Sequence, residues 1–283
     1  MKDTILYGDC RETLKEFGGK VRMCVTSPPY YGLRNYGGEE NQIGQEKTPE
    51  EYIQSLVEVF RSVRDVLADD GTLWVNIGDS YYNYRPGKGQ SYPKQTVSKT
   101  NQDLPQECNK RGNKLEGLKE KDLIGIPWML AFALRSDGWY LRQDIIWNKP
   151  NPMPESVKDR CTKSHEYIFL LSKSQNYYFD VESIKEPTVD NKSLKRKKSV
   201  WNVKTKPYKG AHFAVYPPEL IEPCIKAGSE EGDIILDPFM GSGTTALVAK
   251  SLQRHYLGCE LHEDYGKLIN KRLNEKSFAR IKF

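Results

Sequence analysis

Residues 236–245 read Leu-Asp-Pro-Phe-Met-Gly-Ser-Gly-Thr-Thr, and this stretch lies between a short apolar run and a helical pattern. Glycines in such a turn allow a tight bend and let the backbone approach a ligand closely. The turn lacks the lysine of a phosphate-binding P-loop and departs from the spacing of the dinucleotide fingerprint, which disfavours both classes. An expected strand over 256–259 ends in Glu260, whose carboxylate can accept hydrogen bonds from both hydroxyls of a ribose. The plainer alternative is a glycine-containing turn followed by an unrelated surface glutamate.

Outward from this turn, β-rich runs alternate with amphipathic helical patterns. This order is typical of an α/β fold, in which helices cover both faces of a mostly parallel sheet. We expect one domain over 1–283, with strands at Thr4–Tyr7, Val21–Thr26, 72–77, 141–147, 166–171 and 234–236. We expect helices at 127–136, 218–227, 244–252 and 264–274, and a further helix that begins at the capping box Thr48-Pro49-Glu50-Glu51 and ends at Gly71.

Two polar segments interrupt this rhythm. Residues 80–121 are rich in Gly, Asn, Gln and Lys and are expected to form a polar insertion. Residues 185–210 are polar and basic and are expected to form a linker. Within the linker, the run Lys195-Arg196-Lys197-Lys198 is either a solvated loop or a set of phosphate contacts.

Composition excludes several other classes. The chain has 283 residues and a net charge of +5, which is compatible with a nucleic-acid partner but does not require one. Its start lacks the apolar region of a secretory signal, and its longest apolar run, 128–134, is too short to span a bilayer. Six scattered cysteines contain no CxxC pair, so we expect no metal site, no disulfide framework and a reducing, cytoplasmic location.

A second motif, Ser27-Pro28-Pro29-Tyr30, follows the expected strand Val21–Thr26. Consecutive prolines stiffen the backbone and carry no N–H group, so their carbonyls remain available as acceptors. An exocyclic amino group could donate to the Ser27 hydroxyl and the Pro28 carbonyl, which would aim its lone pair at an incoming methyl group. Tyr30 could stack on a base taken out of a helix; its ring should then matter and its hydroxyl should matter little. A proline-rich turn without function is the alternative for this motif taken alone.

The two motifs together resemble a known family. The tetrad resembles the Ser/Asp/Asn-Pro-Pro-Tyr motif of N4-cytosine and N6-adenine DNA methyltransferases, and 237–245 resembles the S-adenosylmethionine loop of the same enzymes. Residues 212–217 resemble the segment that covers the methionine end of that cofactor. The tetrad precedes the cofactor loop, which is the permuted order of the beta class. The resemblance implies a Rossmann-like methyltransferase fold with permuted motif order, S-adenosyl-L-methionine as cofactor and double-stranded DNA as partner.

The resemblance also implies roles for individual residues. The catalytic set would be Ser27, Pro28, Pro29 and Tyr30. The cofactor set would be Asp9, Cys10, Thr26, His212, Phe213, Asp237, Pro238, Phe239, Gly241, Ser242, Gly243, Thr244 and Glu260. The candidate DNA-binding set is Lys195, Arg196, Lys197 and Lys198. The polar segments 80–121 and 185–210 are candidates for contact with DNA or for target recognition.

Serine in the tetrad tends to accompany cytosine in this family, so we expect a site-specific enzyme that methylates N4 of cytosine by base flipping and direct transfer. N6-adenine methylation is the close alternative. A protein glutamine methyltransferase, whose tetrad begins with Asn, and a non-catalytic DNA-binding relative fit less well. Cys224 after Pro223 lies at helical spacing with Leu220 and is interpreted as a core thiol rather than a nucleophile. His165 and Glu166 are interpreted as structural or DNA-facing.

Overall fold

The computed structural model describes residues 1–32, 42–82, 115–206 and 216–274. Its centre is an eight-stranded sheet, in which the first five strands in spatial order run parallel and β5 runs antiparallel to both of its neighbours. The spatial order is β1 (Thr4–Tyr7), β10 (His255–Glu260), β9 (Ile234–Asp237), β2 (Val21–Thr26), β3 (Leu67–Ile77), β5 (His165–Ser172), β4 (Tyr140–Asn148) and β8 (Val200–Asn202). The expected α/β architecture with a mostly parallel sheet is confirmed.

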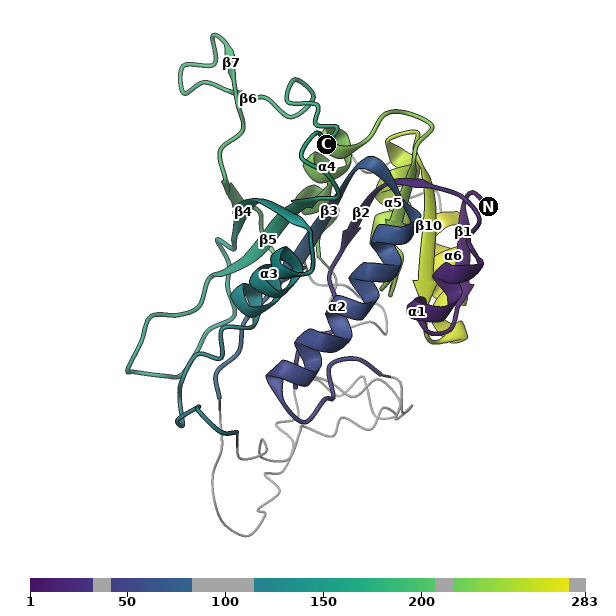
Figure 1. The fold of residues 1–283 in the computed structure, drawn as a ribbon. Coiled ribbons are helices and arrows are strands. Elements are labelled where there is room, and N and C mark those ends of the chain that lie inside the picture. Colours follow the sequence, from purple (N-terminus) through teal and green to yellow (C-terminus); the bar gives the residue numbers. More distant parts are fainter. Residues whose placement is uncertain (33–41, 83–114, 207–215, 275–283) are drawn as a thin grey trace.

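Helices cover both faces of this sheet, each over its own apolar core (Figure 1). One core contains side chains from α1 (Cys10–Thr13), α2 (Pro49–Val66) and α3 (Ile126–Ser136). The other contains side chains from α4 (Pro218–Gly228), α5 (Thr244–Ser251) and α6 (Glu263–Asn274). Cys224 is fully buried in the second core, as expected of a core thiol. Among the described residues, no helix is long and apolar enough to cross a membrane.

The parallel strands bring the two sequence motifs to one edge of the sheet. Strand β2 leads into Ser27, β9 ends at Asp237 and β10 ends at Glu260. Strand β2 pairs with β9 and β9 pairs with β10, all in parallel, so their carboxyl ends lie next to one another. Residues more than 200 positions apart therefore meet above the sheet, at the place where open α/β sheets bind ligands.

The boundary between α2 and β3 differs from the expectation. The capping box at Thr48 and Glu51 forms as expected, but α2 ends at Val66, and Gly71 lies inside β3. A Cβ atom on Gly71 would lie 2.8 Å from the carbonyl oxygen of Arg22 and 2.6 Å from the side chain of Leu67. This glycine therefore permits close packing of a strand and is not a helix terminator.

The described part of the expected linker, residues 185–206, is more ordered than a linker. It contains a two-stranded ribbon of β6 (Glu186–Pro187) and β7 (Leu194–Lys195), followed by β8, which pairs with β4 at the edge of the main sheet. Trp201 of β8 is 5% exposed and belongs to the second core. Most of the expected insertion at 80–121 lies outside the described residues. Its two described ends meet, because the Lys121 amide donates to the Tyr82 carbonyl at 2.9 Å.

Candidate active site

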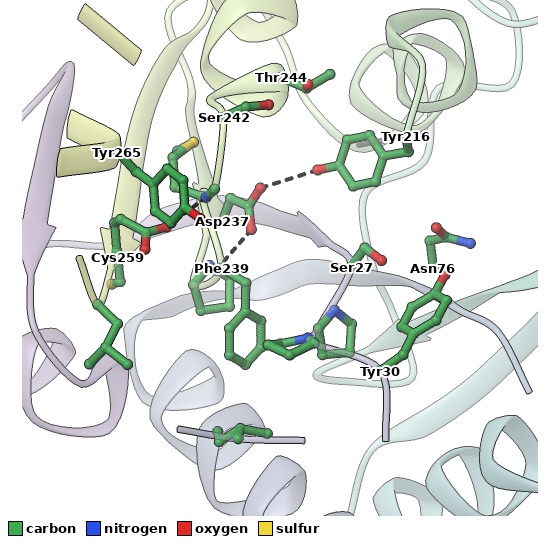
Figure 2. A pocket seen from close by; sticks show the side chains of 18 of the residues that line it. Ser27, Tyr30, Asn76, Tyr216, Asp237, Phe239, Ser242, Thr244, Cys259 and Tyr265 are labelled. Atoms are coloured by element: carbon green, nitrogen blue, oxygen red, sulfur yellow. Dashed lines mark hydrogen bonds between the residues drawn. The ribbon is translucent and has the colours of Figure 1, made fainter. Parts of the chain in front are cut away.

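A pocket of about 490 Å³ lies at the carboxyl ends of β2, β9 and β10. Both sequence motifs line it. Figure 2 shows Ser27, Tyr30 and Asn76 on one side of the pocket, across from Cys259 and Tyr265. The expected site residues that line the pocket are Asp9, Cys10, Ser27, Pro28, Pro29, Tyr30, Asp237, Pro238, Phe239, Gly241, Ser242, Thr244 and Glu260.

The glycine-rich turn is built as its sequence predicts. Gly241 and Gly243 have φ angles of 51° and 77°, in the left-handed region that favours glycine. A Cβ atom on Gly243 would lie 2.7 Å from the side chain of Ile269. Arg272 of α6 fixes the turn from behind: its Nη1 donates to the backbone and side-chain oxygens of Ser242 and to the hydroxyl of Thr244, each at 3.0 Å. Sequence reasoning missed Arg272, because no local pattern links it to a turn thirty residues away.

Asp237 is the structural centre of the site. One carboxylate oxygen accepts from the Thr26 hydroxyl at 2.6 Å and from the Phe239 amide at 3.0 Å. The other accepts from the Thr245 hydroxyl at 2.5 Å and from the Tyr216 hydroxyl at 3.1 Å. Burial raises the pKa of Asp237, and these hydrogen bonds oppose the rise. Asp237 therefore ties the end of β2 to the turn and to Tyr216 (Figure 2). Thr26 itself is fully buried.

Glu260 faces the pocket from the end of β10 and is 8% exposed. Its oxygens accept from the Gly241 amide at 2.8 Å and from the His262 amide at 3.1 Å. Burial raises the pKa of Glu260 to about 7, although these amides lower it. The buried Nε2 atom of His262, in the same pocket wall, has no hydrogen-bond partner among the described residues. An acceptor carboxylate beside an unsatisfied ring nitrogen suits a ligand with hydroxyl groups and nitrogen heteroatoms.

Asp9 and Cys10 lie at the end of β1 and the start of α1. Asp9 caps α1 by accepting from the Arg11 amide at 2.9 Å, and it forms an ion pair with the Arg11 guanidinium at 2.6 Å. Cys10 is 5% exposed. Both residues line the pocket, and their contact with a cofactor stays a prediction.

The Ser-Pro-Pro-Tyr tetrad forms the opposite wall. The Tyr52 hydroxyl of α2 donates to the Pro29 carbonyl at 2.8 Å, which fixes the turn. Within the described ranges, no backbone or side-chain group donates to the Pro28 carbonyl, so this acceptor remains available for a ligand.

The sequence predicts that the Tyr30 hydroxyl contributes little to activity, but in the structure this hydroxyl forms a hydrogen bond. It donates to Glu166 Oε2 at 2.6 Å, and Asn76 Nδ2 donates to the same oxygen at 3.1 Å. Lys149 forms an ion pair with the other oxygen of Glu166. All four residues line the pocket. Sequence reasoning named Glu166 without this role. Glu166 lies at the start of β5, and its partner Tyr30 lies 136 residues earlier in the chain, so the neighbouring sequence gives no sign of the contact.

Other expected site residues do not join the pocket in the described structure. His212 and Phe213 lie outside the described residues. Of the run 195–198, Lys195 lies in β7 and the other three residues lie between β7 and β8, near the amino end of β8, whereas the pocket lies at the carboxyl ends of β2, β9 and β10. Lys195 lies 3.8 Å from Glu186, and Lys197 lies over the Trp201 ring. Contact between this run and DNA stays a prediction. Among the described residues, no cluster of His, Cys, Asp and Glu could hold a metal ion.

Comparison with known proteins identifies the family of the chain. A family model described as DNA methylase, covering the N6 and N4 enzymes, matches residues 21–271. The chain belongs to this DNA methylase family. The methylase is 52% identical to Type II methyltransferase M.SmaI of Serratia marcescens, over 95% of this chain and 90% of that protein. It is 51% identical to M.XycI of Xanthomonas campestris pv. cyanopsidis, over 95% and 87% of the two chains.

Solved structures share the fold of this methylase. The PvuII DNA methyltransferase (cytosine-N4-specific) matches with a TM-score of 0.70 and 19% identity, over 99% of this chain and 90% of that one. A protein of Thermus thermophilus, described as a putative DNA modification methylase and solved in complex with S-adenosyl-L-methionine, matches with a TM-score of 0.64 and 25% identity. That match covers 99% of this chain and 95% of the other. The likeness to the PvuII enzyme, at 19% identity, shows the fold alone.

Proposed function

We propose that this chain transfers a methyl group from S-adenosyl-L-methionine to the exocyclic N4 amino group of cytosine in double-stranded DNA. A DNA amino-methyltransferase that uses S-adenosyl-L-methionine is the family's activity, and the choice of cytosine is the finer proposal. The observation that carries transfer to an exocyclic amino group is the place of Ser27, a hydroxyl at the end of β2 in the same pocket wall as the stiff Pro28-Pro29 turn. The choice of cytosine rests on serine as the first residue of the tetrad.

The pocket residues fit the cofactor. The Glu260 carboxylate can accept from the ribose hydroxyls while its backbone amide contacts remain, because each oxygen carries a second lone pair. The unpartnered Nε2 of His262 offers a further polar contact in the same wall of the described pocket. Gly241 brings its backbone to the pocket without a side chain. Gly243 does not line the pocket and instead permits the close approach of Ile269 to the turn. When bound, the cofactor supplies an electrophilic methyl group on a positively charged sulfur.

The tetrad would hold the acceptor base. Ser27 Oγ and the Pro28 carbonyl accept the two amino protons, which aims the nitrogen lone pair across the pocket towards the glycine-rich turn. This alignment lowers the barrier chiefly by proximity and orientation. The base must leave the duplex to reach the pocket, at a cost of a few kcal/mol, and stacking on the Tyr30 ring offsets part of that cost. The nitrogen attacks directly, so the reaction needs no cysteine nucleophile. The full burial of Cys224 is consistent with this route.

N6-adenine remains the second candidate, since its amino group offers the same two protons to Ser27 and Pro28. The Type II relatives favour a role in restriction and modification. A cytoplasmic location, beside the DNA substrate, is part of the proposal.

The test is chemical identification of the product. Plasmid DNA is incubated with the protein and a cofactor carrying a deuterated methyl group, then digested to nucleosides and analysed by mass spectrometry. We expect labelled N4-methylcytosine. Labelled N6-methyladenine as the sole product would refute the cytosine assignment, and the absence of any labelled nucleoside would refute DNA methylation.

A further inference from the structure

The loop between β4 and β5, residues 149–164, carries an exposed apolar side chain beside the catalytic pocket. Strands β3 and β4 both pair antiparallel with β5, so β4 runs in the same direction as β2, β3 and β9. The loop therefore begins at the sheet edge where the pocket lies. Of the large apolar side chains that are exposed in the described residues, Met153 alone lines the pocket. It is 83% exposed, which places it at the pocket mouth.

The backbone around Met153 is braced. Pro152 and Pro154 flank this residue. Proline fixes its own φ angle and restricts the preceding residue to extended conformations, which limits both Asn151 and Met153. The Asn151 side chain donates to the Thr205 carbonyl at 3.1 Å and accepts from the Thr205 amide at 3.0 Å. The chain therefore holds Met153 in the solvent at a defined place.

The rest of the loop is anchored to the body of the protein and carries a positive balance of charge. The Arg160 guanidinium lies 3.8 Å from the centre of the Tyr81 ring, and Lys163 Nζ donates to the Asp79 carbonyl at 3.2 Å. Residues 149–164 include four lysine or arginine residues and two acidic ones. Such a loop beside the pocket suits the phosphate backbone of DNA, which positions a protein on the duplex.

We propose that Met153 enters the DNA duplex where the target base leaves it and fills the gap in the base stack. The inference rests on the proposed function, and it holds for either cytosine or adenine as the target. A base that reacts in the pocket must leave the stack, and its nucleotide then crosses the pocket mouth. A side chain held at that mouth lies next to the vacated position.

The chemistry of methionine suits this role. Apolar side chains, methionine among them, insert between base steps in proteins that distort DNA. The methionine side chain is unbranched and flexible, so it adapts to an irregular gap, and its sulfur makes favourable contacts with aromatic rings. Insertion would also remove the exposed side chain from water. Met153 would thereby stabilise the extrahelical base without touching the reacting atoms, which makes it a positioning residue.

The test compares a matched duplex with one in which an abasic residue stands opposite the target base. Both duplexes carry a site that the wild type methylates, mapped on methylated plasmid DNA by sequencing. Met153→Ala should slow single-turnover methyl transfer to the matched duplex about tenfold or more, because extrusion of a paired base loses its compensation. On the abasic duplex the loss should be within about threefold, because an unpaired base costs less to extrude.

Two further variants serve as controls. Met153→Leu keeps the apolar bulk and should transfer within about twofold of the wild-type rate. Val157→Ala removes an exposed apolar side chain of the same loop that does not line the pocket, and it should behave as the wild type on both duplexes. The Tm of Met153→Ala and its affinity for S-adenosylhomocysteine should match the wild type, because little of the side chain is buried in the free protein.

Three results would overturn the inference. Wild-type transfer by Met153→Ala on the matched duplex would leave the side chain without this role. Equal losses on the two duplexes, or weaker binding of S-adenosylhomocysteine, would make Met153 a wall of the pocket rather than a group that enters DNA. A wild-type protein that methylates no DNA refutes the proposed function itself, a result distinct from any behaviour of the variants.

Discussion

Glu260→Gln should remove a pH dependence from cofactor binding. In the free protein, burial raises the pKa of Glu260 to about 7. Ribose hydroxyls donate to the ionised carboxylate, so binding requires the proton to leave, and affinity rises as the pH rises through about 7. If the bound form is fully ionised, the free carboxylate goes from about one tenth to about nine tenths ionised between about pH 6 and about pH 8, which strengthens binding about tenfold. This change equals about 1.4 kcal/mol.

The assay is titration calorimetry with S-adenosylhomocysteine in buffers of different ionisation enthalpy. The wild type should release close to one proton on binding near pH 6 and almost none near pH 8. Glu260→Gln should bind more weakly and without this slope. Glu263→Gln, an exposed position in the first turn of α6, should keep the wild-type profile. A wild-type affinity that is flat across this range would refute the placement of the ribose on Glu260, as would a slope retained in Glu260→Gln.

The same shift has a consequence for the stability of the free protein. The folded-state pKa lies above the ordinary 4.5, so the folded state binds the proton more tightly than the unfolded state. The resulting stabilisation is fully present below about pH 4.5 and is lost as the pH rises through about 7. Part of the fall in Tm between these values should therefore be absent in Glu260→Gln.

Three further perturbations test the rest of the site. Ser27→Ala should bind S-adenosylhomocysteine as the wild type does but lose most single-turnover methyl transfer; near wild-type turnover would remove Ser27 from catalysis. Gly243→Val should lower both Tm and cofactor affinity, because φ is 77° and the new Cβ would lie 2.7 Å from Ile269; unchanged calorimetry would contradict the described turn. Replacing residues 195–198 by alanine should weaken binding to all DNA sequences. The slope of log affinity against log salt concentration should become shallower by about 0.9 for each phosphate that is no longer neutralised. An unaltered slope would show that the run is solvated and does not contact DNA.

Local signals in the sequence predicted most of the fold. The capping box at Thr48, the strand Val21–Thr26 and the glycine-rich turn each depend on residues close together in the chain, and each is present in the structure. The sequence predicted that Ser27 and Glu260 each follow a strand. In the structure, the parallel pairing of these strands through β9 brings both residues to one pocket.

Long-range relations set the limit of that reasoning. Gly71 resembles a helix terminator in sequence, but its role depends on the approach of Arg22 from another strand. The three residues of β8 are too few to show a period, and their pairing with β4 comes from tertiary structure. Arg272 and Glu166 act on partners that are distant in the chain, so neither could be recognised from its neighbours.

A crystal structure with bound S-adenosylhomocysteine would test the central claim most directly, because the account requires one pocket to serve both cofactor and amino group. We expect the ribose hydroxyls within about 3 Å of the Glu260 oxygens. We also expect the adenosine along the glycine-rich turn and the sulfur directed towards Ser27 and Pro28. A ligand bound elsewhere, or one whose sulfur faces away from Ser27, would contradict the account.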